Sequence, residues 1–277
     1  MLAEGRKQRI SASVMAVICI INLLIGFIAL ASGAIFVQFS GKRLHNSGAL
    51  CVDASNASDG YVLVCREKCD SKLKLRISKD DITYTYDLNS SGEFEAFPLQ
   101  MGSGCYHFSL YRNVQSNKYT RDGELDLDLV LSDENAPFLC PSQYVNYDQD
   151  SKVVQLSNEL CAGMSSDKEK YEAISSYISK GFVYDYVRAL TTEASYIGDI
   201  DRCIETRMGL CLDYASLVAA MFRCQGIPAQ VVIGYANNYY HAWNNVCIDG
   251  EYRRLDPTAE MKGIAGKSAV YTAERIY

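Results

Sequence analysis

The hydrophobic pattern divides the chain into three parts. Residues 10–41 contain no charged side chain, and residues 14–39 are almost continuously apolar. Short alternating runs follow between residues 61 and 131, and helical spacing begins near residue 153. This succession predicts an apolar segment, a β-rich domain and a mixed domain of helices and strands, with boundaries at residues 10–41, 42–135 and 136–277.

The apolar segment predicts a transmembrane helix. As a helix, residues 14–39 would extend about 39 Å, against a hydrocarbon core of about 30 Å. Three basic residues precede the segment and two follow it, which favours a cytoplasmic N-terminus at residues 1–9. We therefore expect a single-pass signal-anchor in the cell membrane, with the rest of the chain outside the cytoplasm.

A cleaved signal peptide is the alternative for the same segment. Ala29-Leu30-Ala31 fits a small-residue cleavage pattern, but secretory apolar regions usually run only about 7–15 residues. The apolar stretch here continues past Ala31 through Val37. Under either interpretation the protein is extracytoplasmic, and it is secreted if the segment is removed.

The β-rich domain is predicted from six short runs of strand-forming residues. They follow a polar, turn-rich segment at 41–60, which we expect to be a stalk or an irregular entry to the domain. Asn89 to Gly92 is expected to form a hairpin turn, and the whole suggests a small β-sandwich-like domain. The stretch from Asp87 imitates a calcium loop, but Pro98 stands where a bidentate Glu is needed, so we expect no calcium. The candidate strands are residues 61–65, 73–77, 82–88, 94–99, 105–111 and 125–131.

The third part begins with two predicted helices, at 153–161 and 168–179, followed by a looser stretch. A further helix is predicted from Cys211 to about residue 224, ended by Gly226, and its apolar residues on most faces predict that it is buried. Cys211 would then lie in the first turn. There the helix dipole and the unpaired amides favour a thiolate.

Three strands are expected after this helix, at 229–236, 240–248 and 251–255. Asp249-Gly250 predicts a two-residue type I′ hairpin, which fixes the register: His241 would face Thr258, and Trp243 would face Asp256. His241 and Asp256 would then be diagonal neighbours on one face, about 7–8 Å apart in their backbones. A slip of one residue would send them to opposite faces.

Cys211, His241 and Asp256 have the chemistry of a catalytic set. The thiol is the nucleophile, the histidine accepts its proton, and the carboxylate orients the histidine. The chain has only three histidines, and neither His45 nor His107 has comparable neighbours in the sequence.

Composition excludes several other classes of protein. The net charge is −6 with no run of basic residues, so nucleic acid is not an expected partner. There is no C-x-x-C pair, so we expect no metal, and nothing indicates a cofactor. Of the eleven cysteines, Cys51, Cys65, Cys69 and Cys105 could pair with one another outside the cytoplasm, but all could equally stay reduced.

Several motifs resemble those of a known superfamily. They read GLCLDYA at 209–215, GIPA at 226–229, VVIGY at 231–235, HAW at 241–243 and LDPT at 255–258, after lead-in segments at 144–148, 182–185 and 196–201. Over about residues 137–258 the chain resembles the transglutaminase-like superfamily, in particular exported or membrane-anchored bacterial members. Cysteine, histidine and aspartate stand in the family order.

The resemblance implies an α+β, papain-like transglutaminase core, in which a helix packs on an antiparallel sheet. It implies attack of Cys211 on an amide carbonyl, a thioester, and an oxyanion held partly by the Cys211 backbone amide. A tyrosine or tryptophan often assists in the family. Tyr184, Tyr196 and Trp243 are the candidates for that role or for the cleft wall.

The expected function is that of an extracytoplasmic cysteine enzyme acting on a peptide, protein or cell-wall amide. The chain shows neither the calcium loop nor the further β-domains of animal cross-linking members, so peptidase or amidase chemistry ranks above transfer to an amine. The alternative is a catalytically silent surface protein that uses the fold to bind peptide or cell-wall polymer. A third interpretation is adhesion through the β-rich domain.

Overall fold

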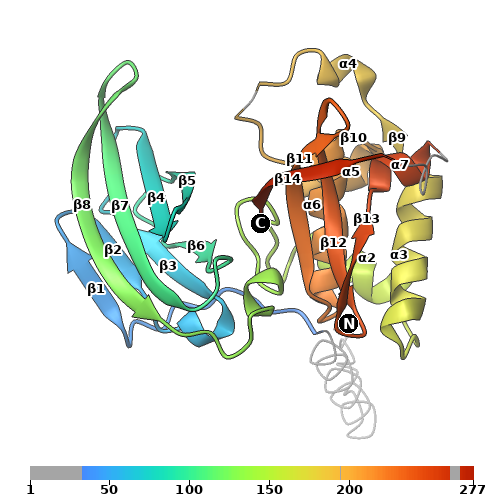
Figure 1. The fold of residues 1–277 in the computed structure, drawn as a ribbon, viewed down its shortest axis with the longest axis horizontal. Helices are drawn as coiled ribbons and strands as arrows, with labels where there is room; N and C mark the ends of the chain where they lie inside the picture. The colour runs from blue at the N-terminus through green and yellow to red at the C-terminus, as the bar shows by residue number, and fades with distance from the viewer. Residues whose placement is uncertain (1–32, 194, 263–268) are drawn as a thin grey trace, which may run out of the picture. The chain divides into compact units, whose positions relative to one another are not determined.

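The computed structural model describes residues 33–193, 195–262 and 269–277 (Figure 1). The expected cleavage site and most of the expected membrane span lie outside these residues. Within the described ranges, no helix has the length and apolar character needed to cross a bilayer.

The C-terminal end of the expected span was predicted wrongly. Residues 33–41 form no helix; Ala34, Ile35 and Phe36 are partly buried against the folded domain, whereas Val37 and Phe39 are exposed. Phe36 makes an edge contact with Tyr147, with ring centroids 6.3 Å apart, and the Phe39 ring lies 4.7 Å from that of Phe94. Contact with the folded domain therefore accounts for the apolar character of Ala34, Ile35 and Phe36.

The β-rich domain consists of two four-stranded antiparallel sheets, seen in blue and green in Figure 1. Buried side chains of both sheets, such as Val64 and Phe108, belong to one hydrophobic cluster. The first sheet has the order β1 (Leu44–Ser47), β2 (Leu50–Asp53), β3 (Tyr61–Cys65) and β6 (Glu95–Pro98). The second has the order β5 (Ile82–Leu88), β4 (Leu73–Lys79), β7 (Gly104–Gln115) and β8 (Lys118–Leu129).

Two expectations for this domain were wrong. The supposed stalk at 41–60 contains β1, β2 and the short 3-10 helix η1 (Ala57–Asp59), because Leu50 and Val52 alternate into the core among turn residues. The turn after Asn89 does not close a hairpin. It joins β5 to β6, which belong to different sheets.

The second half of the chain places helix α6 (Cys211–Cys224) against a sheet of order β13-β12-β11-β14. From Asp213 to Cys224 every residue of α6 is buried, as its apolar sequence predicted. The strands are β11 (Ala229–Ala236), β12 (Tyr239–Ile248), β13 (Glu251–Leu255) and β14 (Tyr271–Ile276). The other elements are η2 (Ala136–Phe138), α2 (Lys152–Leu160), α3 (Asp167–Gly181), α4 (Tyr186–Ala189), α5 (Ile200–Thr206), α7 (Pro257–Met261) and the two-stranded parallel pair β9 (Val183–Tyr184) and β10 (Met208–Gly209).

The hairpin between β12 and β13 has the predicted register. Asp249 and Gly250 both have positive φ, at 53° and 82°, as a type I′ turn requires, and Asn244 pairs with Leu255. The ladder ends at that pair. The expected pairing of Trp243 with Asp256 is therefore wrong: Pro257 has no amide hydrogen for a ladder, and it occupies the first position of α7 instead.

The same correction applies to the expected pairing of His241 with Thr258. Thr258 lies within α7 rather than on a strand. On the opposite side of the sheet, β14 pairs with β11, and Gly234 permits their close approach. A Cβ at Gly234 would lie 2.1 Å from the carbonyl oxygen of Thr272, so a side chain could not be accommodated there without moving the backbone.

Candidate active site

Cys211 is the first residue of α6, directly after the short strand β10. Strand β10 pairs with β9, with Gly209 opposite Tyr184, and this pairing brings Tyr184 close to the start of the helix. A Cβ at Gly209 would come within 2.9 Å of the Asp213 side chain. The glycine before the helix therefore allows the chain to pass close to Asp213.

A buried carboxylate fixes this helix start. Asp213 is fully buried and accepts hydrogen bonds from the backbone amides of Leu210, at 2.7 Å, and of Asp199, at 2.8 Å. It also accepts from the Tyr196 hydroxyl, and the Arg188 guanidinium lies 3.4 Å away. One side chain thus holds the residue before Cys211 together with Arg188, Tyr196 and Asp199.

His241 and Asp256 meet directly. His241 lies on β12, and its Nε2 is 2.9 Å from Oδ2 of Asp256. Asp256 caps α7 by accepting a hydrogen bond from the Ala259 amide at 3.0 Å on Oδ1, and Tyr271 on β14 donates its hydroxyl hydrogen to Oδ2 at 2.7 Å. The carboxylate is therefore held by a helix start, a histidine and a tyrosine.

The charges of this pair favour an imidazolium beside a carboxylate. Burial lowers the pKa of His241, but hydrogen bonds to Asp256 and to Cys211 outweigh it and raise that pKa to about 9. Burial likewise raises the pKa of Asp256, and the bonds from His241 and Tyr271 outweigh it and lower that pKa overall. Because Nε2 is bound to Asp256, Nδ1 is the ring nitrogen left for the thiol.

A cavity of about 310 Å³ opens in front of the thiol and contains both Cys211 and His241 in its wall. Its lining is rich in tyrosine and carries one acidic and one basic residue, Glu193 and Arg275. The lining residues are Tyr144, Tyr184, Ala189, Thr192, Glu193, Tyr196, Leu210, Cys211, Leu212, Ile233, Tyr240, His241, Ala242, Arg275 and Tyr277.

Tyr184 lies beside Cys211 in the cavity wall. Burial and the neighbouring Cys211 thiol raise the pKa of Tyr184 to about 12, although the nearby Cys211 backbone amide acts in the opposite direction. The phenol is therefore protonated at neutral pH, and it lies beside both the thiol and the backbone amide of Cys211.

The other two aromatic candidates occupy different positions. Tyr196 lines the cavity, but its hydroxyl is engaged by Asp213 and by Arg188, 2.8 Å away, so it serves to position the loop. Trp243 is buried and does not line the cavity. Its ring centroid lies 6.4 Å from that of His241, in a stacked arrangement, and 5.0 Å from that of Tyr271, in an edge contact. Trp243 therefore packs against the histidine ring.

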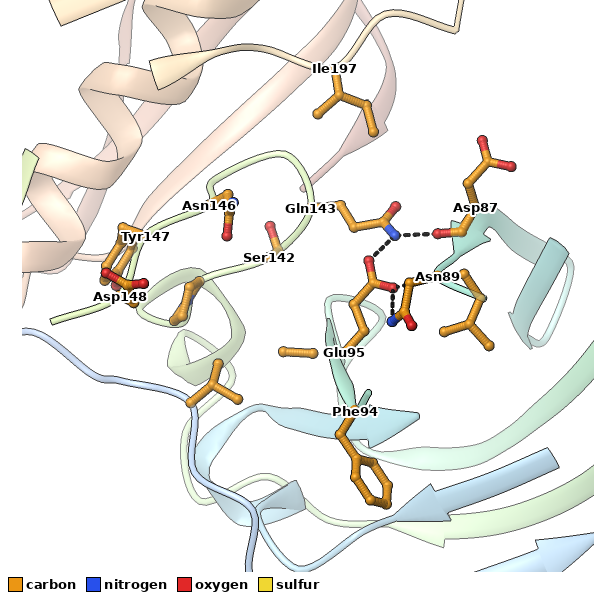
Figure 2. A pocket seen from close by; sticks show the side chains of 14 residues that line it. Asp87, Asn89, Phe94, Glu95, Ser142, Gln143, Asn146, Tyr147, Asp148 and Ile197 are labelled. Carbon is orange, nitrogen blue, oxygen red and sulfur yellow. Dashed lines mark hydrogen bonds between the residues drawn. The ribbon is translucent and has the colours of Figure 1, made fainter. Parts of the chain in front are cut away.

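A larger hollow of about 660 Å³ lies elsewhere in the described part of the chain, and none of Cys211, His241 and Asp256 lines it. Figure 2 shows that the Gln143 amide points to the Glu95 carboxylate and to the Asp87 carbonyl across this hollow. Asn89 also donates to Glu95, at 3.1 Å. The polar groups of this hollow therefore hydrogen-bond to one another. Through them Gln143 connects to Asp87 and Glu95 of the β-rich domain, so we assign these contacts a structural role.

Sequence reasoning missed three residues that shape the site: Asp213, Arg188 and Tyr271. The sequence does carry a signal for Asp213. It is the third residue of a helix that begins shortly after Gly209, and an acidic side chain at that position can reach back to the helix start. Nothing in the local pattern distinguishes the other two. Within the described ranges, no group of three or more potential ligand side chains is placed to hold a metal ion.

Comparison with known proteins identifies the region around the site. Residues 154–257, which include Cys211, His241 and Asp256, match the family model of the transglutaminase-like superfamily. No curated protein sequence matches the chain significantly.

Several solved structures are similar to the chain at low identity. A candidate cysteine protease from Cytophaga hutchinsonii has 19% identity and a TM-score of 0.39, covering 76% of this chain and 80% of that one. A transglutaminase has 23% identity and a TM-score of 0.34, with 44% and 32% covered. A candidate protease from Parabacteroides distasonis has 16% identity and a TM-score of 0.34, with 66% and 37% covered. The chain spans only about a third of the length of the last two. The family match nevertheless identifies residues 154–257 as a transglutaminase-like superfamily domain.

Proposed function

We propose that the protein is a cysteine enzyme that cleaves or transfers an amide through a thioester on Cys211. The observation that supports this most strongly is the contact between His241 and Asp256, 2.9 Å apart, in a histidine that lines the same cavity as Cys211 and whose pKa Cys211 helps to raise. A thiol at the start of a buried helix, an imidazolium and a carboxylate have the roles of nucleophile, acid–base and orienting group.

The first half-reaction forms the acyl-enzyme. The Cys211 thiolate attacks the amide carbon, and negative charge develops on the carbonyl oxygen. The Cys211 backbone amide and the Tyr184 hydroxyl are the proposed donors to that oxygen. As the C–N bond breaks, His241 gives the proton on Nδ1 to the departing amine, which leaves a thioester and a neutral imidazole.

The second half-reaction restores the enzyme. Neutral His241 accepts a proton from water or from an amine, which attacks the thioester carbon, and the C–S bond breaks to release the Cys211 thiolate beside an imidazolium. Water gives a carboxylic acid, and an amine gives a new amide. We rank hydrolysis first, because water has free access to an open cavity, whereas an amine needs a binding site of its own.

The substrate class that we propose is a peptide, protein or cell-wall amide. The cavity lining suits the binding of a polymer with both apolar and polar groups, since each tyrosine presents a flat apolar ring together with a hydroxyl. Placement outside the cytoplasm depends on residues 10–41, and it stays a prediction.

The test uses the full-length chain with Cys211→Ala as the matched control. A library of peptide and glutamine amides is supplied with and without a fluorescent primary amine, and the products are identified by mass spectrometry. We expect carboxylic acid products from the wild type and none from the variant. If neither protein turns over any donor while both bind peptides equally well, the chain is the catalytically silent binding protein instead.

A further inference from the structure

Two cysteines face each other in the first sheet of the β-rich domain. Cys51 on β2 is paired with Cys65 on β3 in the antiparallel ladder, and both are partly exposed. The next pair, Val52 and Val64, is fully buried and points to the other face of the sheet. Among the cysteines in the described ranges, this is the only pair that a strand ladder places opposite each other.

The geometry of this pair suits a disulfide. Directly opposed residues of an antiparallel ladder have Cα atoms about 4.5 or 5.5 Å apart, and both values lie within the roughly 4.4–6.8 Å that a disulfide spans. The two thiols also lie close enough to shift each other's pKa. No movement of the backbone is needed to bring the sulfur atoms together.

We infer that Cys51 and Cys65 are a disulfide-forming site that links β2 to β3, with a low-molecular-weight disulfide such as oxidised glutathione as the oxidant. The thiolate of one cysteine attacks the oxidant and forms a mixed disulfide, releasing one small thiol. The other cysteine, as its thiolate, then attacks the protein sulfur of that mixed disulfide and releases the second small thiol. The protein loses two protons and two electrons, and the oxidant, which takes them up, becomes two thiols.

The bond would tie the first hairpin of the domain to the rest of its sheet. Strands β1 and β2 pair with each other, and β2 is joined to the other strands of the sheet through β3. Strand β2 has only four residues, so its ladder with β3 is short. A covalent link at this point constrains the unfolded chain and so stabilises the domain.

The environment of the two thiols favours a lasting structural bond over a rapid redox signal. Burial raises the pKa of both thiols, that of Cys65 to about 12, where the Cys51 side chain and Glu93 raise it further. Thiolate is therefore scarce near neutral pH and the exchange is slow in both directions. Cys211 differs because it lies beside an imidazolium, and this inference does not depend on its activity.

The experiment starts from reduced full-length protein, which is exposed to oxidised glutathione at mildly alkaline pH and then to iodoacetamide. Trypsin releases Leu44–Arg66 as one peptide, because no lysine or arginine lies between, and it contains no cysteine besides Cys51 and Cys65. We expect this peptide to be unalkylated and lighter by two hydrogens than its reduced form. Cleavage before Asp53 and Asp59 should release residues 53–58 and leave residues 44–52 and 59–66 joined until the disulfide is reduced.

Two further measurements make the result decisive. Oxidation should raise the Tm of the wild type by several degrees and leave that of the Cys51→Ser/Cys65→Ser variant unchanged, whereas Cys105→Ser, which removes an exposed cysteine on the other sheet, should behave as wild type. The inference is overturned if both cysteines are alkylated after complete oxidation, or if either is found linked to a different cysteine of the wild-type chain.

Discussion

His241 and Asp256 lie 2.9 Å apart, Nε2 to Oδ2, although they are not partners in the sheet. The strand ladder ends at Asn244 and Leu255, one pair before Trp243 would face Asp256 in an extended hairpin, and the chain turns at Pro257 into α7. Asp256 therefore points to His241 as a helix cap rather than as a strand residue. Because Ala259 and Tyr271 also donate to it, its orientation is fixed from three directions.

The first prediction concerns the charge of Asp256. Asp256→Asn keeps the volume and the cap oxygen of α7 but removes the charge that stabilises the imidazolium. We expect kcat to fall roughly 10²–10⁴-fold. We expect Tm to fall as well, because the same charge stabilises the folded protein through the imidazolium of His241. The matched control is Asp201→Asn, which neutralises an exposed carboxylate on α5. A fall of less than about threefold would show that the carboxylate does not act through His241.

The second prediction concerns stability against pH. His241 has a folded pKa of about 9, raised from 6.5, so its contribution is fully present below about pH 6.5 and is lost as pH rises through 9. The free energy of unfolding should therefore fall between pH 6.5 and 9, by at most about 3 kcal/mol. Urea unfolding at a series of pH values measures this free energy.

The control for this pH dependence is a pair of histidine variants. His241→Gln should remove the alkaline loss, while His107→Gln, at a histidine on β7, should retain it. A wild-type curve that is flat between these pH values would contradict the raised pKa of His241.

The third prediction separates catalysis from packing at Tyr184. Tyr184→Phe keeps the ring and removes the hydroxyl beside the Cys211 thiol and amide. If the hydroxyl donates to the oxyanion, kcat falls about 10²–10³-fold while KM changes little. Tyr186→Phe is the control, because that ring lies 5.0 Å from Tyr184 but is largely exposed. Equal, small effects in both variants would leave Tyr184 with a packing role.

The fourth prediction concerns the buried carboxylate at the start of α6. Asp213→Ala leaves the Arg188 charge and two backbone amides without their partner, so we expect a loss of about 3–5 kcal/mol in the free energy of unfolding. Asp201→Ala, on the exposed face of α5, should change it by less than about 0.5 kcal/mol. A loss below about 1 kcal/mol for Asp213→Ala would contradict an anchoring role.

The sequence predicted the parts of the site that depend on local patterns. Helix α6 begins at Cys211 as expected, and the Asp249-Gly250 turn fixed the register of β12 against β13. The proximity of His241 to Asp256 was also predicted, but through a ladder that Pro257 prevents. The extended ladder that we expected and the helix cap that the structure shows both bring these two side chains together. In both arrangements His241 and Asp256 lie near the open end of the β12–β13 hairpin.

The remaining features depend on contacts between distant segments. Tyr271 reaches Asp256 only because β14 pairs with β11 at the edge of the sheet. Asp213 binds residues that precede it by up to 25 positions, such as Arg188. Strands β1 and β2 were hidden because four-residue strands between turn residues give too short an alternation to recognise.

The central claim is that His241 activates the thiol of Cys211, and alkylation kinetics test it most directly. The full-length wild type and the His241→Gln and His107→Gln variants are treated with iodoacetamide between pH 5 and 9, and mass spectrometry follows each cysteine. We predict that Cys211 in the wild type and in His107→Gln reacts at least about tenfold faster at pH 6 than Cys211 in His241→Gln. Equal rates for Cys211 in all three proteins at every pH would contradict the claim.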